Sequence, residues 1–320
     1  MTSNVQDAQS VGFIGLGRMG RPMARHLEAA GHRVHVFDVN PERVERATSG
    51  TRLCAEISPR AVAAHVGTLF SALPDDATVT QTYLGADGVL AGALPGLVTC
   101  DCSTVSSEVS RTIAAAAQER GVTHLDTPML GSSPQAESGE IFFMIGGDAT
   151  KVSVVQPYLQ AMGRLSMYVG SSGTANRIKL LHNALGAVNA VAVAESLALC
   201  VDLGVDPRTF YEVVRNGGGM AYSTYFDRRV LRLVEGDYRP TFTLDLMLKD
   251  VTLALRMAAE RAAAMPILRE ALSAYTEARA SGWGSEDFSA VTHVVEGRFG
   301  RSVNKNEGAA QPPAAAMPSR

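Results

Sequence analysis

Short apolar runs alternate with amphipathic stretches through the first half of the chain. The apolar runs are typical of buried strands, and the stretches between them repeat apolar residues every three or four positions, as helices do. Helices are expected, for example, at 20–30 and 106–120. This alternation predicts an α/β domain with a mostly parallel, doubly wound sheet. The expected strands are residues 11–14, 33–38, 68–73, 97–101, 124–126 and 141–145.

The pattern changes after Gly173, where long helical periods replace the alternation. Pro207 and Pro266 suit the first turns of two of these helices. The second half is therefore expected to be all-helical. The expected helices are 174–203, 207–215, 221–234, 243–263, 266–281 and 286–297. The expected organisation is a flexible N-terminus (1–10), an α/β domain (11–170), a helical domain (171–300) and a disordered, Ala/Pro-rich tail (301–320).

Composition narrows the class of protein. The 320 residues are 46% hydrophobic and 19% charged, with a net charge of −3, which fits a soluble globular protein and gives no indication of nucleic-acid binding. The four cysteines form no CxxC pair and no zinc-ligand spacing, so no metal is expected and the thiols are expected to be reduced.

Neither the N-terminus nor the most apolar helix indicates a membrane. The N-terminus lacks the basic and apolar regions of a signal peptide. Asn189, Glu195 and Asp202 interrupt the apolar helix near 184–205, which argues against a bilayer span. We expect a cytoplasmic protein without a membrane partner.

A glycine pattern, G-x-G-x-x-G, follows the first strand and opens the first helix. Gly15 permits a tight turn, Gly17 lets the backbone approach a pyrophosphate, and Gly20 lets helix and strand pack closely. The pattern alone is weak, but this strand–turn–helix context favours a Rossmann nucleotide-binding domain over a turn without a ligand. The expected cofactor loop comprises Gly15, Leu16, Gly17, Arg18, Met19 and Gly20.

Asp38 ends the second strand, about twenty residues after the loop. A carboxylate there accepts hydrogen bonds from the adenosine ribose and repels a ribose phosphate, so NAD is favoured over NADP. Arg43 and Arg33 lie close to this position in the sequence and keep NADP open.

Four separated motifs, in order, resemble those of the β-hydroxyacid dehydrogenase family, which includes 3-hydroxyisobutyrate dehydrogenase and tartronate semialdehyde reductase. Later landmarks at 242–250 and 286–291 agree, so that the resemblance covers roughly residues 11–297. The motifs are GFIGLGRMGRPMA from Gly12, DCSTVSSEVSR (101–111), DTPMLGSSPQAESGEI (126–141) and GTANRIKLLHN (173–183).

The resemblance implies that Lys179 is the catalytic acid/base, placed to exchange a proton with the hydroxyl carbon's oxygen while hydride moves to or from nicotinamide. Asn183, one helical turn later, would bind the substrate or hold the lysine. His182 would contact the substrate, although a histidine on such a helix is more often structural. Without the motif, a helix lysine is usually only solvated.

Further positions match family residues that line the cleft. Phe242 would contact the substrate or serve only as core packing, and Pro74 would serve the cofactor or only a turn. The cofactor-binding positions implied by the resemblance are Leu73, Pro74, Thr104, Lys249 and Asp250.

The substrate loop departs from the family pattern. Leu130, Gly131 and Ser132 stand where the family has S-G-G, so that Leu130 removes a hydroxyl that binds the substrate's carboxylate in typical members. Backbone N–H groups at Gly131 and Ser132, or the hydroxyl of Ser132 or Ser133, would then hold the acid end. The alternatives are a small rearrangement that preserves carboxylate binding and a site for a larger, more apolar or differently anionic substrate.

The sequence thus predicts an NAD-dependent dehydrogenase of a short 3-hydroxy acid or its semialdehyde, working as a homodimer or homotetramer on a small-molecule substrate. Two alternatives remain. One is a nucleotide-binding scaffold without turnover, which Leu130 suggests and Lys179 opposes. The other is an imine reductase on the same fold, whose members generally lack the lysine.

Overall fold

The computed structural model describes residues 10–304. They form two compact units that divide between Lys179 and Leu180, inside helix α9 (Thr174–Asp202). The domain boundary expected at residue 170 lies just before this helix begins. The expected flexible N-terminus, up to residue 9, and residues 305–320 of the expected tail lie outside the described residues.

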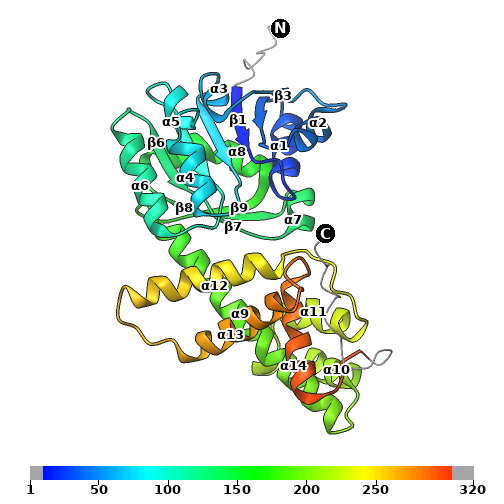
Figure 1. The fold of residues 1–320 in the computed structure, drawn as a ribbon. Helices are drawn as coiled ribbons and strands as arrows, with labels where there is room; N and C mark the ends of the chain where they lie inside the picture. The colour runs from blue at the N-terminus through cyan, green and yellow to red at the C-terminus, as the bar shows by residue number, and fades with distance from the viewer. Residues whose placement is uncertain (1–9, 305–320) are drawn as a thin grey trace, which may run out of the picture. The chain divides into compact units, whose positions relative to one another are not determined.

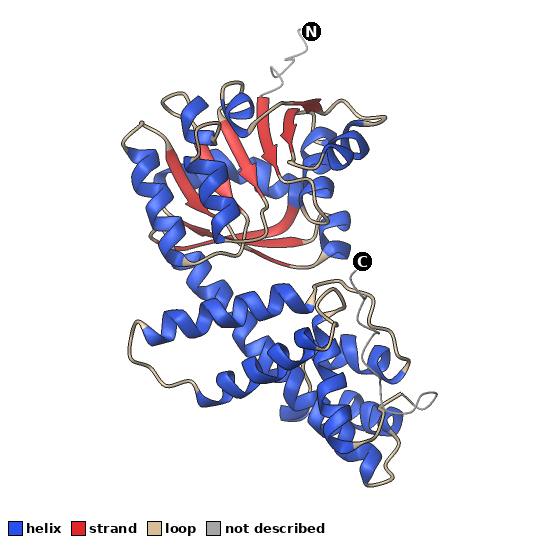
Figure 2. Cartoon of the chain, in the orientation of Figure 1, coloured by secondary structure: helices blue, strands red, loops and turns tan. Residues whose placement is uncertain are grey.

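The first unit is built on one nine-stranded sheet with the order β3-β2-β1-β4-β5-β6-β8-β7, and β9 also pairs with β8 (Figure 1). Strands β1 to β6 are mutually parallel, whereas β8 runs antiparallel to β6 and β7. The predicted mostly parallel, doubly wound sheet is confirmed. The strands, red in Figure 2, are β1 (Ser10–Ile14), β2 (Arg33–Phe37), β3 (Cys54–Ala55), β4 (Thr68–Ser71), β5 (Val98–Asp101), β6 (Thr123–Asp126), β7 (Met129–Leu130), β8 (Ile141–Gly146) and β9 (Gly163–Gly170).

Two apolar cores lie on opposite faces of this sheet. Phe13 packs in one core with helices α1, α7 and α8, and its neighbour Ile14 packs in the other with α3, α4, α5 and α6. Successive strand residues point to opposite faces, so a fully buried strand reads as an apolar run. The helices are α1 (Gly20–Ala29), α2 (Pro41–Thr48), α3 (Pro59–Ala63), α4 (Asp76–Leu84), α5 (Val89–Gly92), α6 (Ser107–Gln118), α7 (Ser133–Ser138) and α8 (Val152–Met162).

Strands β3, β7 and β9 were not expected from the sequence. The first two have only two residues each. Strand β9 pairs with β8 and leaves Leu165, Met167 and Tyr168 46%, 52% and 43% exposed. Because its apolar residues are not consistently buried, it lacks the signature of an inner strand.

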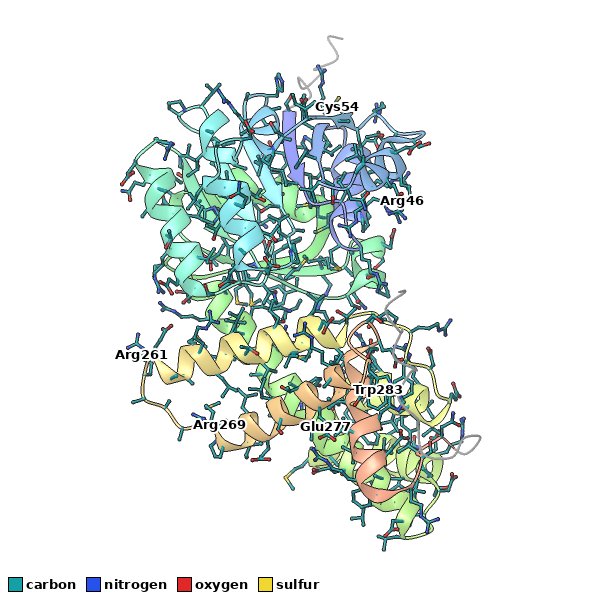
Figure 3. All side chains as sticks on the ribbon, in the orientation of Figure 1. Arg46, Cys54, Arg261, Arg269, Glu277 and Trp283 are labelled. Atoms are coloured by element: carbon teal, nitrogen blue, oxygen red, sulfur yellow. The ribbon has the colours of Figure 1, made fainter. Side chains whose placement is uncertain are left out.

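The second unit is helical, as predicted. Its core is formed by apolar faces of α9, α12, α13 and the segment 288–294, with Trp283 (labelled in Figure 3) 6% exposed. Besides α9, the helices are α10 (Pro207–Gly217), α11 (Thr224–Val234), α12 (Leu244–Ala259), α13 (Pro266–Ala280) and α14 (Thr292–Phe299), with 3₁₀ turns at Gly219–Ala221 and Phe288–Val291.

The helix expected at 286–297 begins later than predicted, because Asp287 holds the residues before it in a 3₁₀ turn. The carboxylate of Asp287 accepts the Ser289 N–H and hydroxyl at 3.3 and 2.9 Å and pairs with Arg229 at 3.0 Å. This buried carboxylate caps the 3₁₀ turn, and α14 starts only at Thr292. The sequence shows that an aspartate stands at this position, but it does not show that Arg229 pairs with it.

Helix α9 is long and apolar enough to cross a membrane by length and composition alone, with a mean hydropathy of 1.8. The core helix of a globular protein satisfies the same criterion. Leu180, Ala184, Ala187 and Ala190 of α9 are buried in the core of the second unit. Length and composition therefore do not distinguish a membrane span from a core helix here.

Candidate active site

The glycine loop has the geometry that a dinucleotide site needs. Gly15 has φ of +92°, and a Cβ there would lie 2.3 Å from the Ala72 carbonyl oxygen. A Cβ on Gly20 would lie 1.8 Å from the Gly15 carbonyl oxygen, so both positions require glycine. A Cβ on Gly17 would meet nothing within 4 Å. That open space beside the N-terminus of α1 suits a pyrophosphate.

Asp38 closes the same site from the end of β2. Its carboxylate is buried and accepts the Leu16 N–H at 2.7 Å and the Asn40 N–H at 2.9 Å. The half-exposed guanidinium of Arg43 lies 3.6 Å from Oδ2. The loop and the carboxylate are therefore held together as a ribose site requires, and these residues fit NAD.

A buried hydrogen-bond network holds the Leu73–Pro74 loop. The Leu73 N–H donates to the Ser103 hydroxyl at 2.8 Å, and the hydroxyls of Ser103 and Ser71 donate to Asp101 Oδ1. Burial raises the pKa of Asp101 to about 6, although these hydrogen bonds oppose the shift. Sequence reasoning missed Asp101 and both serines; the signal was a carboxylate that ends a buried strand.

Asp126, the last residue of β6, was missed in the same way. Its fully buried carboxylate accepts the Gly173 N–H at 2.8 Å and the Asn176 N–H at 3.2 Å. Burial raises the pKa of this carboxyl, whereas these N–H groups lower it. Two donors from the start of α9, which lack partners within the helix, are thus satisfied by strand β6.

Asn176 ties the same turn of α9 to the β5–α6 loop, where Thr104 lies. Its Oδ1 accepts the Val105 N–H at 3.2 Å, and its Nδ2 donates to the Ser110 hydroxyl at 3.1 Å. Lys179, three residues after Asn176, is only 8% exposed. The lysine therefore sits one turn beyond an anchored helix start, within the nucleotide-binding unit.

The second unit gathers four of the predicted site residues. The Nδ2 of Asn183 donates to Asp250 Oδ2 at 2.5 Å, and Lys249 Nζ lies 3.1 Å from Oδ1 of that buried carboxylate. His182 Nδ1 lies 3.0 Å from Asn183 Oδ1. Since that oxygen only accepts, Nδ1 carries the proton, and the amide of Asn183 is fixed in orientation.

Phe242 packs edge-on against Phe288, with ring centroids 6.1 Å apart, in the core of the second unit. This contact satisfies the core-packing interpretation of Phe242. Its role toward a substrate stays a prediction.

The substrate loop is ordered around Gln135. Leu130 lies on β7 opposite Phe142 of β8, and Gly131 has φ of +136°. Ser132 donates its N–H and its hydroxyl to Gln135 Oε1 at 2.9 and 2.7 Å. The roles assigned to these residues and to Ser133 stay predictions.

No group of three or more His, Cys, Asp or Glu residues is placed to hold a metal ion within residues 10–304. The first unit offers a dinucleotide loop and a buried lysine, and the second unit offers a hydrogen-bonded amide and carboxylate.

Two family models cover most of the chain. The NAD binding domain of 6-phosphogluconate dehydrogenase matches residues 10–170, and the NAD-binding domain of NADP-dependent 3-hydroxyisobutyrate dehydrogenase matches residues 173–295. The chain belongs to the β-hydroxyacid dehydrogenase family. It is an oxidoreductase that binds NAD and acts on a CH–OH group of a small molecule, as predicted. The preference for NAD over NADP stays a prediction.

Relatives match over nearly their whole length. The 2-(hydroxymethyl)glutarate dehydrogenase of Eubacterium barkeri is 33% identical over 92% of this chain and 97% of that protein. The NAD-dependent L-serine dehydrogenase of Pseudomonas aeruginosa is 34% identical over 90% and 98%. The structure of Mycobacterium tuberculosis 3-hydroxyisobutyrate dehydrogenase with L-serine has a TM-score of 0.81, with 28% identity over 90% and 99%.

Imine reductases share only the fold. One from a Pseudomonas species is 18% identical, with a TM-score of 0.59. The imine-reductase alternative therefore has weaker support than the hydroxyacid-dehydrogenase interpretation.

Proposed function

We propose that this enzyme oxidises the primary alcohol of a short 3-hydroxy acid, HOCH₂–CH(R)–COO⁻, to the semialdehyde, and catalyses the reverse reduction. The substrates named for three relatives, 2-(hydroxymethyl)glutarate, L-serine and 3-hydroxyisobutyrate, all contain this unit and differ in R. The observation that carries the proposal is the buried Lys179 on a helix whose start is anchored by Asp126 and Asn176.

Bound NAD supplies the hydride acceptor. In oxidation, Lys179 Nζ takes the hydroxyl proton of the substrate, and in reduction it returns a proton to the developing alkoxide. Asn183, oriented by His182 and Asp250, would present its remaining amide hydrogen to the substrate oxygen, or its carbonyl oxygen to an N–H of the lysine. Both roles require that the side chains of Lys179 and Asn183 keep a fixed position. The hydrogen bonds of Asn176 and Asn183 support such a position.

The loop after β6 would hold the acid end of the substrate through donors of Gly131, Ser132 and Ser133. Leu130 would add apolar contact beside R. NAD would be preferred over NADP because Asp38 occupies the ribose position. The helical unit would serve substrate binding and assembly.

We further propose a cytoplasmic homodimer or homotetramer. Large apolar side chains of the second unit are exposed in the single chain, among them Leu181 (54%), Leu185 (65%) and Leu203 (69%). Covering them in an assembly would stabilise it by about 25 cal/mol per Å² of apolar surface. Sedimentation velocity of the full chain tests this.

The function is tested by NADH formation with a panel of acids, 3-hydroxyisobutyrate, L-serine, 3-hydroxypropionate and 2-(hydroxymethyl)glutarate, with NADP in parallel. Lys179→Ala is expected to cut turnover by roughly 10²–10⁴-fold while leaving NAD affinity unchanged. Lys151→Ala, which changes a lysine outside the proposed site, is the control. NAD binding without turnover of any acid would favour the scaffold alternative, and near-normal turnover of Lys179→Ala would remove the lysine from the mechanism.

A further inference from the structure

Gln135 occupies the hydrogen-bond donors that the substrate's acid end is proposed to use. Its side-chain oxygen accepts both the N–H of Ser132, at 2.9 Å, and the Ser132 hydroxyl, at 2.7 Å. A carboxylate oxygen bound by the loop would take the same two hydrogen bonds. The amide oxygen of Gln135 therefore stands in for an oxygen of the acid end.

We infer that Gln135 is a specificity-determining residue that competes with the substrate's carboxylate for Ser132. The inference rests on the proposed function, because it assumes that the acid end binds at this loop. Gln135 sets how strongly a short acid is held, and its removal strengthens that binding.

Competition follows from the hydrogen-bonding capacity of Ser132. Its backbone has one N–H and its side chain one hydroxyl hydrogen, and both are already used. A carboxylate must therefore displace the Gln135 amide or bind through other donors. Displacement exchanges one pair of hydrogen bonds for another, which weakens binding relative to a loop whose donors are free.

The neighbouring residues replace the occupied hydrogen-bond donors of Ser132 only in part. The hydroxyl oxygen of Ser133 is buried and has no hydrogen-bond partner within residues 10–304. It offers one further donor to an acid end, whereas Leu130 offers none. Short acids held only by their carboxylate should therefore bind weakly, and acids with additional contacts through R should be favoured.

A purely structural role makes a different prediction. Ser132 and Gln135 are arranged as a capping box at the start of α7. If Gln135 only capped this helix, its loss would lower thermal stability without improving substrate binding. The sign of the change in KM therefore separates the two roles.

The experiment compares wild type, Gln135→Ala and Gln135→Glu, with Glu140→Gln as a matched control. Glu140 is exposed and lies five residues after Gln135, and Glu140→Gln makes the charge change opposite to that of Gln135→Glu. Each protein is assayed with saturating NAD and either 3-hydroxyisobutyrate, L-serine or the methyl ester of 3-hydroxyisobutyrate. Binding of both acids to the NADH-loaded enzyme is measured by calorimetry.

We expect Gln135→Ala to lower KM for both acids at least fivefold, with kcat within threefold and NAD affinity unchanged. Gln135→Glu should raise KM for the acids at least tenfold through like-charge repulsion, and should affect the neutral ester less than threefold. Glu140→Gln should match wild type within twofold.

Turnover of the acids with KM unchanged or raised in Gln135→Ala would overturn the inference and leave the proposed function standing. If neither wild type nor Gln135→Ala turns over or binds any acid, the proposed function fails and the inference fails with it.

Discussion

Asp126 Oδ1 accepts the backbone N–H of Gly173 at 2.8 Å, a hydrogen bond that spans 47 residues of sequence. It joins the carboxyl end of strand β6 to the segment that opens α9. The same carboxylate accepts the Asn176 N–H, so that one side chain fixes the first turn of the helix that carries Lys179. A carboxylate at a helix N-terminus is also stabilised by the helix dipole.

Asp126→Ala is expected to lower kcat by about 10- to 100-fold and to destabilise the protein by about 2–4 kcal/mol, because two buried N–H groups lose their acceptor. Asp126→Asn keeps one acceptor oxygen and should lose less activity. Turnover, NAD affinity and thermal unfolding are measured. Asp148→Asn, which alters another capping carboxylate of the same unit, is the control. Normal kcat in Asp126→Ala would show that the helix start needs no anchor.

Asp38→Ala should shift the cofactor preference toward NADP at least tenfold in the ratio of kcat/KM values. The change removes the carboxylate that would repel a ribose phosphate and leaves Arg43, 3.6 Å from it, available to that phosphate. Arg43→Ala in the Asp38→Ala background should reverse part of the shift. An unchanged ratio in Asp38→Ala would place the ribose elsewhere.

Asn183→Ala should lower kcat by about 10- to 100-fold. The change removes the amide that donates to Asp250 at 2.5 Å and accepts from His182 at 3.0 Å, and it leaves a buried carboxylate with one fewer donor. The NAD affinity of the variant and its kcat against pH are measured. Asn189→Ala, on the same helix, should retain wild-type kcat. Equal losses in both variants would indicate a general effect on α9.

Much of the fold was predictable because its signals are local. Inner strands such as β1 are buried on both faces and therefore appear in the sequence as apolar runs. The glycine loop is recognised by the G-x-G-x-x-G spacing of its glycines. Strand β9 was not predicted, because the burial of its side chains depends on its position in the sheet and not on its own sequence pattern.

The residues that hold the site were harder to predict. Lys179 and Asn183 were found through a motif, whereas the acceptors Asp101 and Asp126 were not singled out. Their function depends on partners 2–50 residues away in sequence, such as Ser71 and Asn176. A single sequence gives the residue types but not which donors the fold brings to them.

His293 of the second unit makes stability depend on pH. Its Nδ1 lies 3.0 Å from Glu296 and its Nε2 3.7 Å from Glu286. Burial lowers the pKa of His293, but hydrogen bonds and charges of the two glutamates outweigh burial and raise the pKa to about 9. Glu296 also accepts the Val303 N–H at 2.7 Å, so residues 301–304 of the expected disordered tail include a buried, hydrogen-bonded Val303.

Because the folded-state pKa of His293 lies above the ordinary value of 6.5, its contribution to stability is complete below pH 6.5 and is lost as the pH rises through 9. That contribution is at most about 3 kcal/mol. His293→Gln should therefore lower the Tm at pH 6 and flatten the fall of Tm between pH 6.5 and 9. Thermal unfolding across that range measures both effects. His65→Gln, which changes a histidine with a side chain 54% exposed, should keep the wild-type slope. A wild-type slope in His293→Gln would assign the pH dependence to other groups.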